Sequence, residues 1–179
     1  MEKLFNDSEL LSKDRPTKIT QQQQEDFYKE IAEDIIKNNW SDSDLEDVVS
    51  DVSKITFNDS GYEIAKDLEG YDKDASYDID SSFIEFLEHL SYRFSEVLKK
   101  NVRYWVETHN PQPKFSKGTK LIVETPITHL HKKDSVVFVT GHDEKHACYY
   151  IHEDSERNGG YVLNYEDIES KCKLHSNED

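Results

Sequence analysis

The sequence predicts an α+β protein, in which an acidic bundle of about four helices is followed by a small β-barrel. Apolar residues recur at helical spacing through the first part of the chain. After Pro113 they recur at every second position, in short β-branched and aromatic runs. We therefore expect a flexible tail at residues 1–19, an acidic helical domain at 20–110 and a barrel domain at 114–174, with the Pro-rich segment at 110–113 between the two domains.

Local capping signals place the first two helices. Thr20 and Gln23 fit a capping box, so the first helix is expected to begin there. Ser43 and Glu46 fit a second box, which predicts a helix over about residues 44–55. Each segment carries a stripe of apolar residues that would face a core.

Two more helices are expected before the Pro-rich segment. A short one is predicted over residues 62–69, with Gly70 as its stop. The last is predicted to run unbroken from about residue 82 to residue 109, because apolar side chains keep helical spacing throughout. Pro111 and Pro113 then prevent its continuation.

Short strands are expected in the second part of the chain, separated by turn-forming residues. The Asn158-Gly159-Gly160 segment is a strong turn signal. A small closed barrel is the economical way for such short strands to hide their edges. The expected strands cover residues 120–124, 135–140, 147–152 and 160–164.

Residues 115–169 resemble an SH3-like small barrel. The resemblance rests on Phe115–Gly118 before the first strand, on a second strand closed by Gly141, and on Tyr165–Ile168, which is similar to the one-turn helix before the last strand of that fold. The loop at 125–134 departs from the pattern, because it lacks the usual glycine before the second strand. The resemblance implies a fold and not a function.

Charge is distributed unevenly along the chain, whose formal net charge is -16. Residues 25–88 hold 20 Asp and Glu against 5 Lys, a net charge of -15, whereas residues 89–123 are basic. The two stretches could neutralise one another internally. Alternatively, an exposed wall of carboxylates would imitate nucleic-acid phosphates and attract a basic protein. The candidate partner-binding residues are Asp42, Asp44, Glu46, Asp47, Asp51, Asp67, Asp72, Asp74 and Asp78.

Motifs for metal binding or catalysis are incomplete. The acidic run at 72–80 lacks the glycine and glutamate that an EF-hand calcium loop requires. The two cysteines, Cys148 and Cys172, are too few for a disulfide scaffold and are interpreted as free thiols. We therefore predict no metal, no cofactor and no enzymatic activity. One alternative stays open, a zinc site made by His142, His146, Cys148 and His152.

These observations predict a non-enzymatic acidic protein that occupies the nucleic-acid-binding site of a basic partner. The style of the helical part resembles small accessory proteins of bacteriophages, which implies an inhibitor of a host nuclease or defence system. The alternative is a nucleic-acid-binding or regulatory module that acts through the barrel and the basic residues of 93–120. No secretion signal or membrane-spanning run is evident, so we expect a cytoplasmic protein, in the host cytoplasm if phage-encoded, with no membrane partner.

Overall fold

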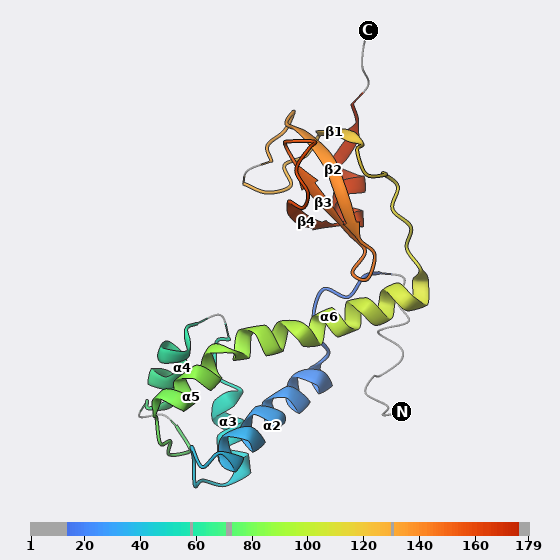
Figure 1. Cartoon of the computed structure of the whole chain (residues 1–179). Helices are drawn as coiled ribbons and strands as arrows, with labels where there is room; N and C mark the ends of the chain where they lie inside the picture. Colours follow the sequence, from blue (N-terminus) through green and yellow to red (C-terminus); the bar gives the residue numbers. More distant parts are fainter. Residues whose placement is uncertain (1–13, 58, 71–72, 130, 176–179) are drawn as a thin grey trace. The chain divides into compact units, whose positions relative to one another are not determined.

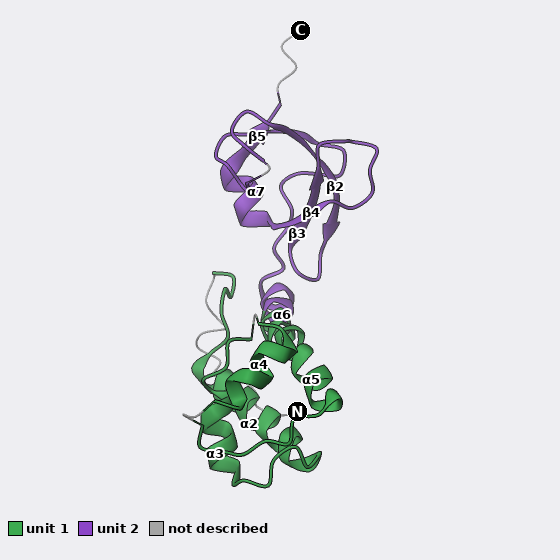
Figure 2. Ribbon diagram, turned by 90° about the vertical axis from the view of Figure 1, so that its left-hand side faces the viewer, with its two compact units in different colours: residues 1–101 green, residues 102–179 purple. Residues whose placement is uncertain are grey.

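The computed structural model describes residues 14–175, except 58, 71–72 and 130 (Figure 1). It combines helices with an antiparallel sheet, so the predicted α+β class is confirmed. The chain forms two compact units, Met1–Asn101 (unit 1) and Val102–Asp179 (unit 2), coloured separately in Figure 2. The division falls inside a helix, nine residues before the expected Pro-rich boundary begins at residue 110.

Unit 1 is helical. It contains α2 (Gln21–Lys37), α3 (Leu45–Val52), α4 (Gly61–Leu68), α5 (Ser81–Glu88) and the first part of α6 (Leu90–His109). The capping box predicted at Thr20 is present, because its hydroxyl accepts the Gln23 N–H and the Gln23 side chain accepts the Thr20 N–H. The fully buried core residues of this unit include Ile31, Ile35, Val48, Val52, Phe83, Leu87 and Leu90.

The start of α3 differs from the prediction. Asp44, not Ser43, is its N-cap residue, and the predicted capping box does not form. The Ser43 hydroxyl instead accepts the Ser76 N–H at 3.0 Å, which ties the chain before α3 to the segment before α5. The Ser43 hydroxyl could accept a hydrogen bond either from its own helix or from a distant backbone N–H, and the tertiary fold brings the distant one within reach.

The single long helix expected over residues 82–109 is also wrong, because the chain breaks at His89. The His89 N–H bonds to the carbonyl three residues back, on Phe86, at 3.2 Å. The Glu88 carboxylate accepts the N–H of Gly61 at the start of α4. The break lets α5 pack on α4, while α6 packs on α2 through Phe94, whose ring lies 5.4 Å from that of Phe27.

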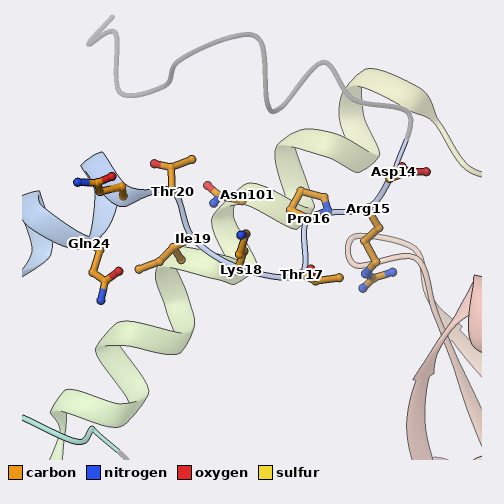
Figure 3. A pocket seen from close by; sticks show the side chains of 10 residues that line it. Asp14, Arg15, Pro16, Thr17, Lys18, Ile19, Thr20, Gln24 and Asn101 are labelled. Carbon is orange, nitrogen blue, oxygen red and sulfur yellow. The ribbon is translucent and has the colours of Figure 1, made fainter.

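The segment before α2 lies near Asn101 of α6 (Figure 3). The expected flexible tail lies outside the described residues up to residue 13. Residues 14–20 line an open cleft of about 560 Å³ together with Gln21, Gln24 and Asn101 (Figure 3). Asn101 is buried, and its side-chain amide exchanges two hydrogen bonds of 2.8 Å with Gln23. This buried pair fixes the start of α2 against α6 within unit 1.

Unit 2 is a five-stranded antiparallel sheet with strand order β4-β3-β2-β1-β5. Its strands are β1 (Lys120–Val123), β2 (Val136–Asp143), β3 (Cys148–His152), β4 (Tyr161–Asn164) and β5 (Cys172–Leu174). The helix α7 (Tyr165–Lys171) joins the last two strands and is labelled in Figure 2. The sheet formed by the described strands does not close, so the expected closed barrel is not found there, and the SH3-like resemblance stays a prediction.

Unit 2 has its own core, which includes the last turns of α6. Trp105 is buried in one cluster with Phe115, Leu121 and Tyr149. This packing explains why the boundary lies inside α6.

In the loop that lacks a glycine, Asp134 adopts φ 67° and supplies the left-handed turn before β2. Among the described residues, no helix is both long and apolar enough to cross a bilayer.

Candidate acidic interface

A buried carboxylate organises the most acidic part of unit 1. Asp51 on α3 is 0% exposed. Its oxygens accept the Asp74 N–H at 3.1 Å, the Ala75 N–H at 3.0 Å and the Tyr77 hydroxyl at 3.2 Å, and the Lys54 ammonium lies 3.3 Å away. A buried charge is tolerated only when it is bonded in this way. Asp51 therefore holds the loop before α5 onto α3, and its predicted role as a surface contact is wrong.

A second set of hydrogen bonds joins the chain before α3 to the same loop. The Ser41 hydroxyl donates to the Ser76 carbonyl at 2.7 Å, and the Ser76 hydroxyl donates to Asp42 at 3.1 Å. The Asp78 N–H donates to the Trp40 carbonyl at 2.8 Å. Two acidic segments that are distant in the sequence are thus fixed side by side. Sequence reasoning did not find this role of the serines, although Ser41 to Asp44 alternate hydroxyl and carboxyl groups.

Most of the predicted residues keep their carboxylates in solvent. Asp47 is half-exposed, and Asp67 is exposed on a different helix, α4. Asp72 lies outside the described residues. We define the acidic interface as the residues that the two hydrogen-bonded segments bring together, Asp42, Asp44, Glu46, Asp47, Asp74 and Asp78.

An open cleft of about 380 Å³ lies between the two segments of this interface. Two carboxylates and a tyrosine contribute to its wall. Carboxylates are the acceptors that guanidinium and ammonium groups bind most strongly, since both partners are charged. The cleft can therefore accept a basic side chain. Its lining residues are Asn39, Ser41, Asp42, Ser76, Tyr77 and Asp78.

Local partners tune two groups at the edge of the interface. Hydrogen bonds from Lys54, at 3.1 Å, and Ser50, at 2.9 Å, lower the pKa of the Asp74 carboxyl. Burial, and then the neighbouring Asp51 charge, raise the pKa of the Tyr77 hydroxyl. Tyr77 therefore stays protonated and donates to Asp51, while Asp74 forms an ion pair with Lys54.

Two cations of α6 bond to carboxylates outside the acidic interface. Arg93 bonds to Glu30 at 2.6 Å and to Asp34 at 2.9 Å, both on α2. Lys99 bonds to Glu96 on its own helix at 2.8 Å. Internal neutralisation therefore applies to α2. Within the described residues, one ion pair is found in the acidic interface, between Lys54 and Asp74.

The histidines and cysteine of the zinc alternative make separate bonds. His142 Nε2 lies 2.8 Å from the Phe115 carbonyl, and His146 Nδ1 lies 2.8 Å from Asp143. The Cys148 thiol donates to the His146 carbonyl at 3.2 Å. In the part of the chain that the structure describes, no three His, Cys, Asp or Glu side chains gather as metal ligands.

Comparison with known proteins adds no relative to this picture. No family model matches the chain, and no similar protein is found among the curated proteins or the solved structures. The geometry and charge of the acidic interface are therefore the only guide to function.

Proposed function

We propose that this chain is a non-enzymatic binding protein whose acidic interface occupies the nucleic-acid-binding site of a basic partner protein. The observation that carries the proposal is the arrangement around Asp51. One buried carboxylate, with no part in a surface contact, holds two acidic segments side by side and leaves the side chains of Asp42, Asp44, Glu46 and Asp78 exposed.

Such an arrangement favours binding for two physical reasons. Like charges in one place repel, so crowding them lowers stability unless a partner neutralises them. Carboxylates held by a rigid scaffold also lose little conformational entropy on association. The field of the interface would steer a basic surface towards it and speed association at low salt.

The proposed partner is a basic protein that itself binds nucleic acid, such as a nuclease or another host defence protein, and the chain would act as a phage inhibitor in the host cytoplasm. Unit 1 supports this choice through its charge, since residues 1–101 hold 25 acidic and 12 basic residues, a net charge of -13. A protein that binds DNA through phosphate contacts presents the complementary charge.

Charge reversal at the acidic interface tests the proposal. The test variant carries Asp42→Lys, Asp44→Lys and Glu46→Lys. The matched control reverses three exposed carboxylates outside the interface, Glu25→Lys, Glu33→Lys and Glu85→Lys. Both have the same net charge, so a general loss of attraction would affect them equally.

Each immobilised protein is incubated with bacterial lysate, and the bound proteins are eluted with salt and assayed for DNA binding. We expect the wild type and the control to retain DNA-binding proteins and the test variant to lose them. Equal capture by all three would contradict the proposal, and so would captured proteins that do not bind nucleic acid.

A further inference from the structure

The sheet of unit 2 ends in two edges that differ in protection. β4 pairs with β3, and β5 pairs with β1, so each has one open side among the described strands. Open edges expose backbone N–H and C=O groups that pair readily with another strand. On β5, Lys173 bonds to Glu124 at 3.0 Å and places a charge on the edge. β4 contains no charged residue and no proline.

Two neighbouring apolar side chains are exposed on the edge strand that carries no charge. Tyr161 is 43% exposed and Val162 is 55% exposed, on opposite faces of a strand that has four residues. An open edge strand with exposed apolar side chains is a template for pairing with another strand. β4 combines this apolar exposure with an open edge that has no charge and no proline, so it is the edge more open to a partner strand.

The backbone of β4 directs Val162 to the open side. The Tyr165 N–H donates to the Ala147 carbonyl of the neighbouring chain segment at 3.0 Å. The register pairs Leu163 with Tyr149, and these residues lie two positions from Tyr165 and Ala147 on their own chain segments. Leu163 and Tyr149 therefore form a hydrogen-bonded pair as well. Since antiparallel strands alternate inward and outward backbone groups, Leu163 points towards β3 and Val162 points away from it. Val162 thus offers both an N–H and a C=O to an added strand.

A buried histidine packs against the first residue of β4. His131 is 0% exposed, and its ring meets the Tyr161 ring edge-on, with centroids 4.7 Å apart. The Thr128 hydroxyl lies 2.9 Å from His131 Nδ1 and fixes the orientation of the ring. A rigid edge loses little entropy when it binds, which favours recognition.

Charge selects the occupant of this edge. Residues 153–171 hold 6 acidic and 2 basic residues, whereas the rest of unit 2 holds 7 acidic and 8 basic ones. Along the chain, acidic residues lie before and after β4: Glu153, Asp154 and Glu156 precede it together with Arg157, and Glu166 and Asp167 follow it. A second copy paired antiparallel on β4 would bring acidic ends against acidic ends. A strand with basic ends meets opposite charge at both.

We propose that the open edge of β4 binds an extended peptide segment, with apolar residues at alternate positions and lysine or arginine at both ends, as an added strand. Main-chain hydrogen bonds to Val162 supply affinity, and the exposed Tyr161 and Val162 side chains contact the apolar residues of the peptide. This site lies on unit 2 and is independent of the acidic interface on unit 1.

The probe is a fluorescent synthetic peptide, Lys-Lys-Val-Thr-Val-Thr-Val-Lys-Lys, titrated against the full chain and followed by anisotropy and by amide NMR. We expect the amides of Val162 and Asn164 to shift. Val162→Lys should weaken binding about tenfold or more, which corresponds to about 1.4 kcal/mol. The matched control, Leu174→Lys, adds the same charge to the 62%-exposed residue of the other edge and should leave affinity unchanged.

Two further peptides separate strand addition from general attraction. A version N-methylated at alternate residues cannot donate to β4 and should not bind, and a version with glutamates in place of the lysines should bind much more weakly. Equal affinity of Val162→Lys and wild type, undiminished binding of the N-methylated peptide, or no binding of the parent peptide would each overturn the proposal. Concentration-dependent dimerisation through the β4 amides would overturn it in favour of a second copy.

Discussion

Replacing Asp51 by alanine should destabilise unit 1 far more than any other loss of a carboxylate on α3. In the wild type this side chain accepts the N–H groups of Asp74 and Ala75 and the hydroxyl of Tyr77. Asp51→Ala leaves those three donors without their acceptor. It also removes the partner of Lys54 on α3.

The magnitude follows from the number of donors. Each buried donor that loses its acceptor costs about 1–3 kcal/mol. The loop before α5 is partly exposed, so water replaces some of the lost bonds. We therefore expect the free energy of unfolding of unit 1 to fall by about 3–4 kcal/mol, a large fraction of the stability of a small domain.

The two tryptophans allow each unit to be followed in the full chain. Trp40 stacks on Phe83 in unit 1, with ring centroids 5.1 Å apart, and Trp105 is buried in unit 2. Urea unfolding is measured by fluorescence in two backgrounds, Trp105→Phe and Trp40→Phe. Asp51→Ala should move the Trp40 transition to lower urea and leave the Trp105 transition in place.

Asp47→Ala is the matched control, since it removes a half-exposed carboxylate from the same helix. It should cost less than about 1 kcal/mol. If Asp51→Ala costs no more than this control, Asp51 does not hold the loop on α3.

Three further predictions concern other parts of the fold. Asp80 accepts the Phe83 N–H at 2.8 Å at the start of α5, so Asp80→Ala should lower the urea concentration at which unit 1 unfolds. A Cβ on Gly61 would overlap the Ile84 carbonyl oxygen, so Gly61→Ala should separate α4 from α5 and lower the melting temperature measured by circular dichroism. Burial lowers the pKa of His131 from its ordinary 6.5, so the unfolded chain takes up the proton first as pH falls. Unit 2 should therefore lose stability as the pH falls below about 6.5, and this loss should be smaller in His131→Gln.

Each of these has a contradicting result. An Asp80→Ala variant as stable as wild type would mean that the cap contributes nothing to α5. A Gly61→Ala variant with an unchanged melting temperature would show that the two helices can move apart freely. An identical pH dependence in wild type and His131→Gln would remove His131 as the titrating group.

Local signals in the sequence were sufficient where the structure is local. The capping box at Thr20 predicted the start of α2, because a cap depends on residues within one turn. The alternation of apolar residues predicted β1, β3 and β4 to within one residue or two at each end. The turn glycines were also informative, since Gly159 and Gly160 adopt positive φ angles of 83° and 144°.

Tertiary contacts decided the features that the sequence could not predict. The apolar spacing continues through His89, so the break depends on the contact of α5 with α4 and not on a local breaker. Trp105 continues the stripe of α6 but packs in the core of unit 2, which moved the boundary between the units.

A signal for the role of Asp51 was present but was not used. Asp51 follows Val48 by three residues and precedes Ile55 by four, so helical spacing places it on the apolar stripe of α3. A carboxylate on a buried stripe needs donors from elsewhere in the fold. On this ground Asp51 could have been predicted as a buried acceptor and left out of the predicted partner-binding residues.

Competition with DNA tests the proposed mimicry most directly. A basic protein captured by the chain is loaded with a fluorescent DNA duplex, and the chain is then added at increasing concentration. We predict that the duplex is released as the chain binds, and that the Asp42→Lys, Asp44→Lys, Glu46→Lys variant releases none. A stable complex that holds the partner, the duplex and the chain together would contradict the account.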